Sequence, residues 1–144
     1  MDAGHNTQTG GCIQRMGQAL IYDWRNFWRL FERLKPLEES MELPRIEPMA
    51  NPAPFGFPIT VRKYVDRQAL INHLEATKIE TRLVSGGKIL HELGFLNIAR
   101  RVYGSLEASD RILRDTFFLG VFPGLGRAKI NHMLEQIFAF FVAR

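Results

Sequence analysis

Five prolines that fall within fifteen residues divide this chain and limit how it can fold. They are Pro44, Pro48, Pro52, Pro54 and Pro58. Each proline fixes its own φ, lacks a backbone N–H and pushes the preceding residue toward extended geometry. A long helix does not continue through such a stretch. Residues 37–54 are therefore predicted to form a semi-rigid, proline-rich connector between a helical segment, 1–36, and a second unit, 55–144.

The residues before the connector predict a helix with one broad aromatic face, from about Ile13 to Lys35. Apolar side chains recur at helical spacing, with charged residues between them. They are Leu20, Trp24, Phe27, Trp28, Phe31 and Leu34. Pro36 is expected to end this helix, because proline lacks a donor and clashes with the preceding turn.

Strand and helix patterns alternate after the connector. Strands are predicted over 57–62, 81–84 and 116–122. Asp66 is expected to cap one helix, and Ser109 or Asp110 to cap a short helix that runs through Arg114. A last helix is predicted from six apolar residues at helical spacing. They are Ile130, Met133, Leu134, Ile137, Phe138 and Phe141. A small sheet with packed helices follows, which is the α+β class.

Composition excludes several classes of function. The 144 residues are 46% hydrophobic, yet no apolar run approaches the roughly 20 residues of a membrane helix, so we expect no membrane partner and a cytoplasmic location. One cysteine, Cys12, makes no internal disulfide, and no metal-ligand spacing is present. The net charge of +4 is spread along the chain, so nucleic acid is not an expected partner.

Three motifs carry a family resemblance. They are Phe55 to Thr60 (FGFPIT), Asp110-Arg111-Ile112, and Thr116 to Leu125 (TFFLGVFPGL). Together they resemble the carboxyl-terminal part of nucleotide-sugar 3-dehydratases, of the CDP-4-dehydro-6-deoxyglucose 3-dehydratase type. These enzymes are close relatives of the DegT/DnrJ/StrS-like sugar aminotransferases of pyridoxal-phosphate (PLP) fold type I. The resemblance implies a small C-terminal domain preceded by a long linker helix, with a remnant of the domain junction inside residues 1–36.

The resemblance also implies a function in deoxysugar and O-antigen lipopolysaccharide biosynthesis. The substrate would be a nucleotide-linked 4-keto-6-deoxy sugar, and the cofactor pyridoxamine or pyridoxal phosphate. The catalytic base, the cofactor site and the cysteines of the family's 2Fe–2S cluster would lie in a large domain that is not in this sequence. We therefore expect no catalytic, cofactor or metal residue here. The chain is expected to be a fragment, inactive alone, whose partner is the large domain or a second copy in a homodimer.

Three residues are predicted to bind substrate. Arg111 stands at the start of a predicted helix, where backbone N–H groups favour an anion and the guanidinium adds a planar fork. The resemblance implies that it contacts the substrate, and that Phe55 and Phe57 border the same pocket. The opposing interpretations are an arginine solvated beside a neighbouring aspartate, and an alternating pair of core aromatic residues.

Two other functions remain open from the sequence. The parent enzyme could be a sugar aminotransferase of the same superfamily. The chain could instead be a non-catalytic binding or assembly module, since the aromatic helix of Trp24 to Phe31 would seek a partner if a large domain did not cover it. The chain also departs from the dehydratases at Lys88 and at His91-Glu92-Leu93, where the family usually carries Asn and Arg-Gln-Pro.

Overall fold

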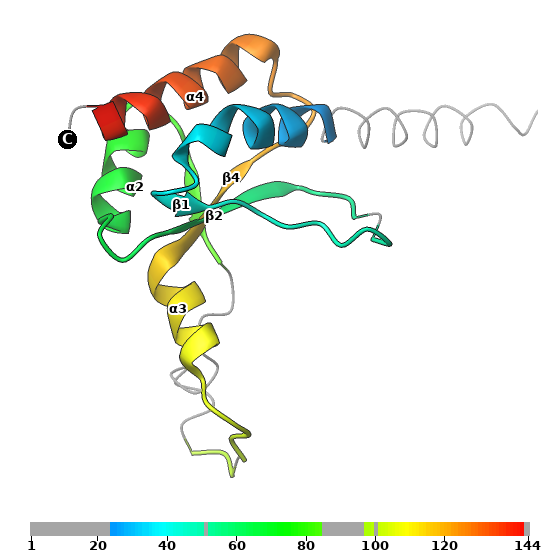
Figure 1. Ribbon diagram of the computed structural model, residues 1–144, viewed down its shortest axis with the longest axis vertical. Coiled ribbons are helices and arrows are strands. Elements are labelled where there is room, and N and C mark those ends of the chain that lie inside the picture. The colour runs from blue at the N-terminus through cyan, green and yellow to red at the C-terminus, as the bar shows by residue number, and fades with distance from the viewer. Residues whose placement is uncertain (1–23, 51, 85–96, 100, 143–144) are drawn as a thin grey trace, which may run out of the picture.

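The structure, a computed structural model, describes residues 24–50, 52–84, 97–99 and 101–142. A helix over 24–34 leads into the short 3-10 helix η1 (Lys35–Leu37). The remaining elements are β1 (Met41–Glu42), β2 (Gly56–Val61), α2 (Arg67–Ala76), β3 (Thr81–Leu83), α3 (Glu107–Asp115), β4 (Thr116–Gly120) and α4 (Arg127–Val142). The four strands form one antiparallel sheet in the order β1-β2-β4-β3 (Figure 1). The predicted α+β class is confirmed.

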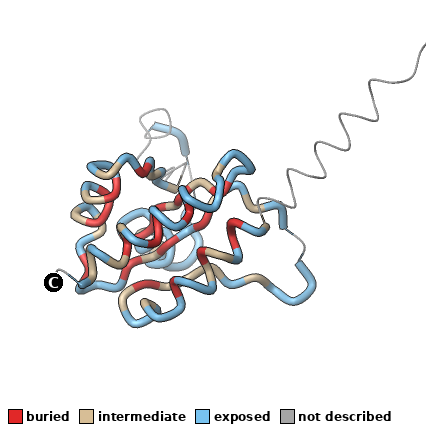
Figure 2. Tube along the Cα trace, turned by 90° about the horizontal axis from the view of Figure 1, so that it is seen from above, coloured by how far each residue is buried: buried red, intermediate tan, exposed pale blue. Residues whose placement is uncertain are grey.

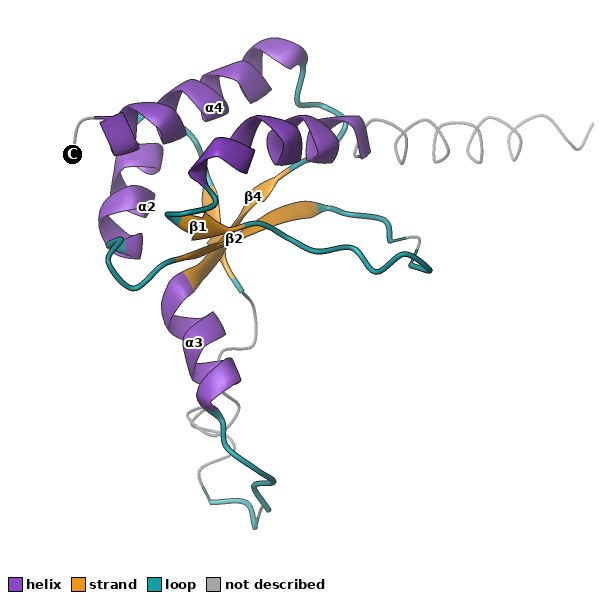
Figure 3. Cartoon of the chain, viewed as in Figure 1, coloured by secondary structure: helices purple, strands orange, loops and turns teal. Residues whose placement is uncertain are grey.

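Three helices cover one face of this sheet, as Figure 3 shows for helix 24–34, α2 and α4. The register of β2 and β4 places Phe57 opposite Leu119 and Ile59 opposite Phe117, so these four side chains project to the same face. All four are fully buried. The helices contribute further buried residues, which are Phe27, Leu30, Leu34, Leu70, Ile71, Leu74, Ile130, Met133, Leu134 and Ile137. Burial is therefore concentrated between the helices and the sheet (Figure 2).

Local sequence patterns predicted most of these elements. The Oδ1 atom of Asp66 accepts a hydrogen bond from the backbone N–H of Ala69 at 3.1 Å, which confirms the predicted cap of α2. Pro36 lies in the first turn of η1, directly after helix 24–34 ends. The predicted part of that helix before residue 24 lies outside the described residues. No helix within the described ranges is long and apolar enough to span a bilayer.

The proline-rich connector contains a strand that the sequence did not predict. In β1, Met41 pairs with Val61 and Glu42 with Thr60. The same register continued by two residues would place Pro44 opposite Pro58. Neither proline has a backbone N–H to donate, so the ladder cannot continue there. This explains why β1 is only two residues long and why a proline is tolerated inside β2.

The predicted start of α3 was wrong. The helix begins at Glu107, after Leu106, and no side chain caps it. Ser109 and Asp110 therefore lie inside the first turn instead of preceding it. Arg111 consequently lies in the second turn of α3, not at its start. The free N–H groups of the helix terminus do not contribute to anion binding at this guanidinium.

Candidate functional site

The second face of the sheet adjoins two of the three predicted site residues, Arg111 and Phe55. Gly56, Pro58 and Thr60 of β2 and Phe118 and Gly120 of β4 alternate with the buried residues and project away from the three helices. We call this surface the open face. One of its ends adjoins α3 and is polar, whereas the other end is aromatic.

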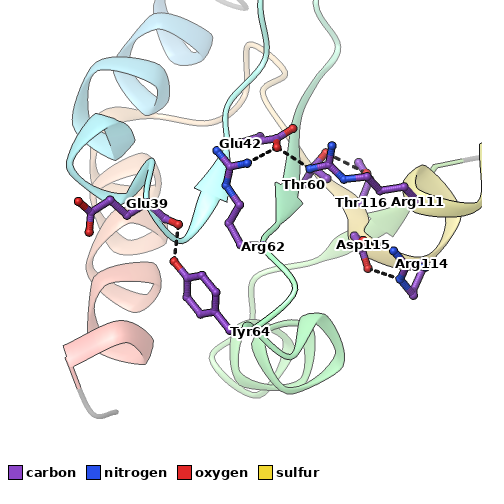
Figure 4. A network of polar contacts seen from close by, with 9 residues as sticks. All are labelled: Glu39, Glu42, Thr60, Arg62, Tyr64, Arg111, Arg114, Asp115 and Thr116. Carbon is purple, nitrogen blue, oxygen red and sulfur yellow. Dashed lines mark hydrogen bonds and ion pairs between the residues drawn. The ribbon is translucent and has the colours of Figure 1, made fainter. Parts of the chain in front are cut away.

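Arg111 lies at the polar end and is ion-paired there. Its Nη2 atom donates to Oε1 of Glu42 at 2.5 Å, and Nη1 of Arg62 donates to the same oxygen. Figure 4 shows the two guanidinium groups converging on the Glu42 carboxylate. The Arg111 side chain is 44% exposed. Two positive charges share one negative charge, so the cluster retains a net positive charge that faces solvent.

The same end contains two further polar contacts. The hydroxyls of Thr60 and Thr116 lie 2.9 Å apart, which joins β2 to β4 beside the cluster. Arg114 forms a bidentate pair with Asp115, with both N–H to oxygen distances at 2.8 Å. Asp115 thus pairs with Arg114, while Arg111 reaches Glu42, 69 residues away in sequence.

Glu42 is held in its ionised form by this cluster. The hydrogen bond from Arg111 lowers the pKa of the Glu42 carboxyl, partial burial opposes this, and the charges of Arg111, Arg62 and Arg45 lower it further. The ion pairs therefore persist as the pH falls below the usual glutamate range, and are lost when the carboxylate is finally protonated.

The substitution Glu42→Gln should make the stability of the protein vary less with pH in the acid range. A lowered folded-state pKa contributes stability that is fully present above the unfolded pKa, about 4.3, and is lost as the pH falls through the folded pKa. At pH 7 we expect the free energy of unfolding of the variant to be lower by less than about 1 kcal/mol, because Glu42 and its arginine partners are partly exposed. That difference should shrink below about pH 4. Melting temperatures of both proteins from pH 7 to pH 3 check this, and parallel curves would contradict it.

The aromatic end of the open face borders a cavity of about 800 Å³. Phe55 is 75% exposed, and its ring packs edge-to-face on Phe118 with centroids 5.7 Å apart. The Phe118 ring in turn lies over Gly56, where an added Cβ would come within 2.6 Å of its Cδ2 atom. Glycine at this position therefore allows the ring to lie flat against the strand.

The three predicted substrate residues do not form one cluster. Phe57 is fully buried, with its ring centroid 5.0 Å from that of Phe27. The structure thus corrects the expectation for Phe57, which packs in the core and is not exposed to a ligand in this chain. Arg111 contacts Glu42, which lies opposite Thr60, while Phe55 lies just before the start of β2, five residues from Thr60. Arg111 and Phe55 therefore lie at opposite ends of the open face, since five residues of extended chain span roughly 17 Å.

Sequence reasoning missed Glu42 and Arg62. Glu42 belongs to the open face only because β1 pairs with β2, and that pairing joins residues about twenty positions apart. No local motif marks them. The alternation of strand β2 continues to Arg62, which is the one pattern that could have placed this arginine on the same face as Thr60.

Within the part of the chain that the structure describes, the donor set does not fit the groups that the resemblance implies for the whole enzyme. No cluster of three or more His, Cys, Asp or Glu within the described ranges could hold a metal. The single cysteine, Cys12, cannot supply the thiolates of an iron–sulfur cluster and lies outside those ranges. A PLP ring nitrogen takes an acidic or basic partner. On the cavity wall the carboxylate of Glu80 and the guanidinium of Arg82 are instead paired with each other at 2.5 Å.

Comparisons with known proteins agree with the fold and the motifs, although no family model matches the chain. The lipopolysaccharide biosynthesis protein RfbH of Salmonella typhimurium is 36% identical over 131 residues, which is 90% of this chain and 30% of RfbH. The dTDP-4-dehydro-2,6-dideoxy-D-glucose 3-dehydratase of Saccharopolyspora spinosa is 37% identical over 134 residues, 92% of this chain and 28% of that enzyme. The chain thus spans about three tenths of these relatives.

Solved structures of dehydratases and aminotransferases that act on sugars share the fold. The E. coli GDP-4-keto-6-deoxy-D-mannose-3-dehydratase with bound hydrated PLP superposes with a TM-score of 0.77 at 15% identity, over 87% of this chain and 32% of that one. Sugar aminotransferases share it as well. Over most of its length this chain is therefore similar in sequence to a nucleotide-sugar 3-dehydratase, as its motifs predicted, it shares the fold of such enzymes and of sugar aminotransferases, and it spans about three tenths of its sequence relatives.

Proposed function

We propose that this chain supplies one wall of the sugar-nucleotide pocket of a PLP- or PMP-dependent 3-dehydratase in deoxysugar and lipopolysaccharide biosynthesis. The observation that carries the proposal is the position of Arg111. Its guanidinium lies on the open face, where the Glu42 carboxylate accepts hydrogen bonds from both Arg111 and Arg62. A guanidinium with remaining N–H donors suits a diphosphate or a sugar hydroxyl.

Phe55 is the second proposed contact. It lies at the far end of the open face from Arg111, and the strand between Thr60, beside Arg111, and Phe55 spans about 17 Å. An extended nucleotide sugar is comparable in length, so the polar and aromatic ends would contact different parts of one ligand. The flat, exposed ring of Phe55 suits the apolar face of a base or of a deoxysugar.

The proposed roles of this chain are binding, orientation and the exclusion of water from one side of the pocket. Elimination beside a keto group needs an electron sink, which the cofactor supplies and no common side chain provides. The described residues do not fit that cofactor, so no chemical step is assigned to them. The proposed partner is a cofactor-bearing large domain, with a homodimer as the assembled form in the cytoplasm, and any 2Fe–2S cluster would belong to that domain.

A chimera tests the proposal. The matching 134-residue segment of the Saccharopolyspora spinosa relative is replaced by this chain, and turnover of dTDP-4-dehydro-2,6-dideoxy-D-glucose is measured with added cofactor. Within an active chimera, Arg111→Ala should lower kcat/KM by about tenfold, the size expected for loss of a charge-assisted hydrogen bond.

Arg114→Ala is the matched control, because Arg114 lies on the same helix but pairs with Asp115. It should leave kcat/KM within about twofold, since the Arg114 guanidinium is held by Asp115 and does not belong to the Glu42 cluster. Equal losses in the two variants would contradict a contact between Arg111 and substrate. A folded chimera that takes up cofactor but shows no turnover would favour the other candidate, an assembly module, which the 43% exposed Trp28 beside Trp24 also suits.

A further inference from the structure

Glu42 presents its carboxylate to the polar end of the open face from a well-fixed backbone. It belongs to β1, whose other residue, Met41, is fully buried in the core. The backbone N–H of Arg62 donates to the carbonyl of Ser40 at 2.9 Å, which continues the pairing of β1 with the chain after β2. A carboxylate on a paired and anchored strand has a better-defined position than one on a loop.

Arg111, in contrast, lies on a helix that packs little against the core. Asp115, the last residue of α3, is the only buried residue of that helix. Arg67 anchors the same end, because its Nη1 atom donates to the carbonyls of Leu113 and Thr116 at 2.9 and 3.2 Å. These contacts fix the backbone at the end of α3. They do not fix the long side chain of Arg111, which has several rotatable bonds and depends on its ion pair for orientation.

One oxygen atom of Glu42 holds two guanidinium groups close together. Nη2 of Arg111 and Nη1 of Arg62 both donate to Oε1, as Figure 4 shows. Two hydrogen bonds to a single oxygen place the donor nitrogens within roughly 6 Å of each other. Two positive charges at this separation repel, and the carboxylate between them offsets the repulsion. Both guanidinium groups remain partly exposed, so N–H donors of Arg111 are left for a ligand.

We propose that Glu42 is a positioning residue, which orients the Arg111 guanidinium before substrate arrives, while Arg62 holds the Glu42 carboxylate from its other side. Glu42 itself does not contact the substrate. The inference rests on the proposed function, in which Arg111 is the substrate contact. Orienting a long side chain in advance reduces the conformational entropy that is lost when the ligand binds. Loss of the Glu42 carboxylate should therefore weaken the contact that Arg111 makes.

A double-mutant cycle in the chimera tests this role. Glu42→Gln keeps the shape of the side chain but removes its charge, and should lower kcat/KM by about fivefold. A carboxylate that only opposed a negatively charged substrate would have the reverse effect, because its neutralisation would raise kcat/KM. In the Arg111→Ala background the same substitution should cost less than about a further twofold, since no guanidinium is left to orient. Equal losses in both backgrounds would indicate a merely structural role and overturn the inference.

A measurement without substrate separates this inference from the proposed function. In the full 144-residue chain, the heteronuclear NOE of the Arg111 Nε–H group reports how rigidly the guanidinium is held. We expect this NOE to fall in Glu42→Gln and to stay unchanged in the control Glu32→Gln, whose carboxylate pairs with Lys35. An unchanged NOE in Glu42→Gln would overturn the positioning role. A lowered NOE together with an Arg111→Ala chimera of full activity would uphold the positioning of Arg111 and contradict only its contact with substrate.

Discussion

Replacing Phe57 with alanine is expected to lower the free energy of unfolding by about 3 to 5 kcal/mol. The side chain is fully buried, packs on Phe27 and lies opposite Leu119 in the central strand pair. Its removal leaves a cavity between helix 24–34 and the sheet, which surrounding side chains fill only in part. Urea denaturation followed by far-UV circular dichroism measures the change.

Phe55→Ala is the matched control for this prediction. The same side chain is removed two residues away, but Phe55 is 75% exposed and contacts mainly the edge of Phe118. We expect a loss of less than about 1 kcal/mol. If both alanine variants were equally mild, Phe57 could not be a core residue, and its predicted place beside the substrate pocket would have to be restored.

Phe55 and Phe57 show what the alternation of side chains along a strand cannot predict. A period of two predicts that Phe55 and Phe57 project to the same side, but not which side is covered by helices. The chain also bends at Phe55, before β2 begins at Gly56. The bend brings the Phe55 ring onto Phe118, which projects to the opposite face from Phe57. The two residues therefore separate into a surface ring and a core ring.

Features with a local cause were predictable. The cap at Asp66 and the apolar spacing of α4 depend on residues within one or two turns, and both predictions were confirmed. The start of α3 was predicted wrongly for a related reason: Ser109 and Asp110 are both good capping residues, yet the helix begins before them without any side-chain cap. A strong local preference was overridden by its context.

Features that depend on distant pairing were not predictable. Strand β1 requires Met41 and Glu42 to meet the end of β2, and nothing within the proline-rich segment indicates this. The partner of Arg111 follows from the same pairing, since Glu42 reaches the open face only as part of β1. The family motifs identified Arg111 as a candidate, but its electrostatic environment required the register of the sheet.

Asn26 is a third consequence of long-range packing, and Asn26→Asp is expected to destabilise the protein by about 3 kcal/mol at pH 7. The side chain is buried, and its Nδ2 atom donates to the carbonyls of Val121, Phe122 and Leu125 at 3.5, 3.3 and 3.1 Å. These contacts fasten helix 24–34 to the turn after β4. An aspartate of the same shape would direct a carboxylate, which has no donor, at oxygen atoms.

The pH dependence of this variant separates lost hydrogen bonds from buried charge. Burial near carbonyl oxygens should raise the pKa of the new carboxyl above its usual value of about 3.9. The destabilisation is then present above the raised pKa and declines as the pH falls through it, because the protonated acid is neutral and regains a donor.

Asn26→Ala is the control, since it loses the same donor without adding a charge, and should cost about 1 to 2 kcal/mol at every pH. Urea denaturation of both variants between pH 7 and pH 4 is the measurement. If the difference in unfolding free energy between the two variants narrows toward pH 4, the Asn26 side chain must be buried against the three carbonyl groups. A constant gap would mean that the aspartate reaches solvent, and that helix 24–34 is not fastened to the turn after β4 through this side chain.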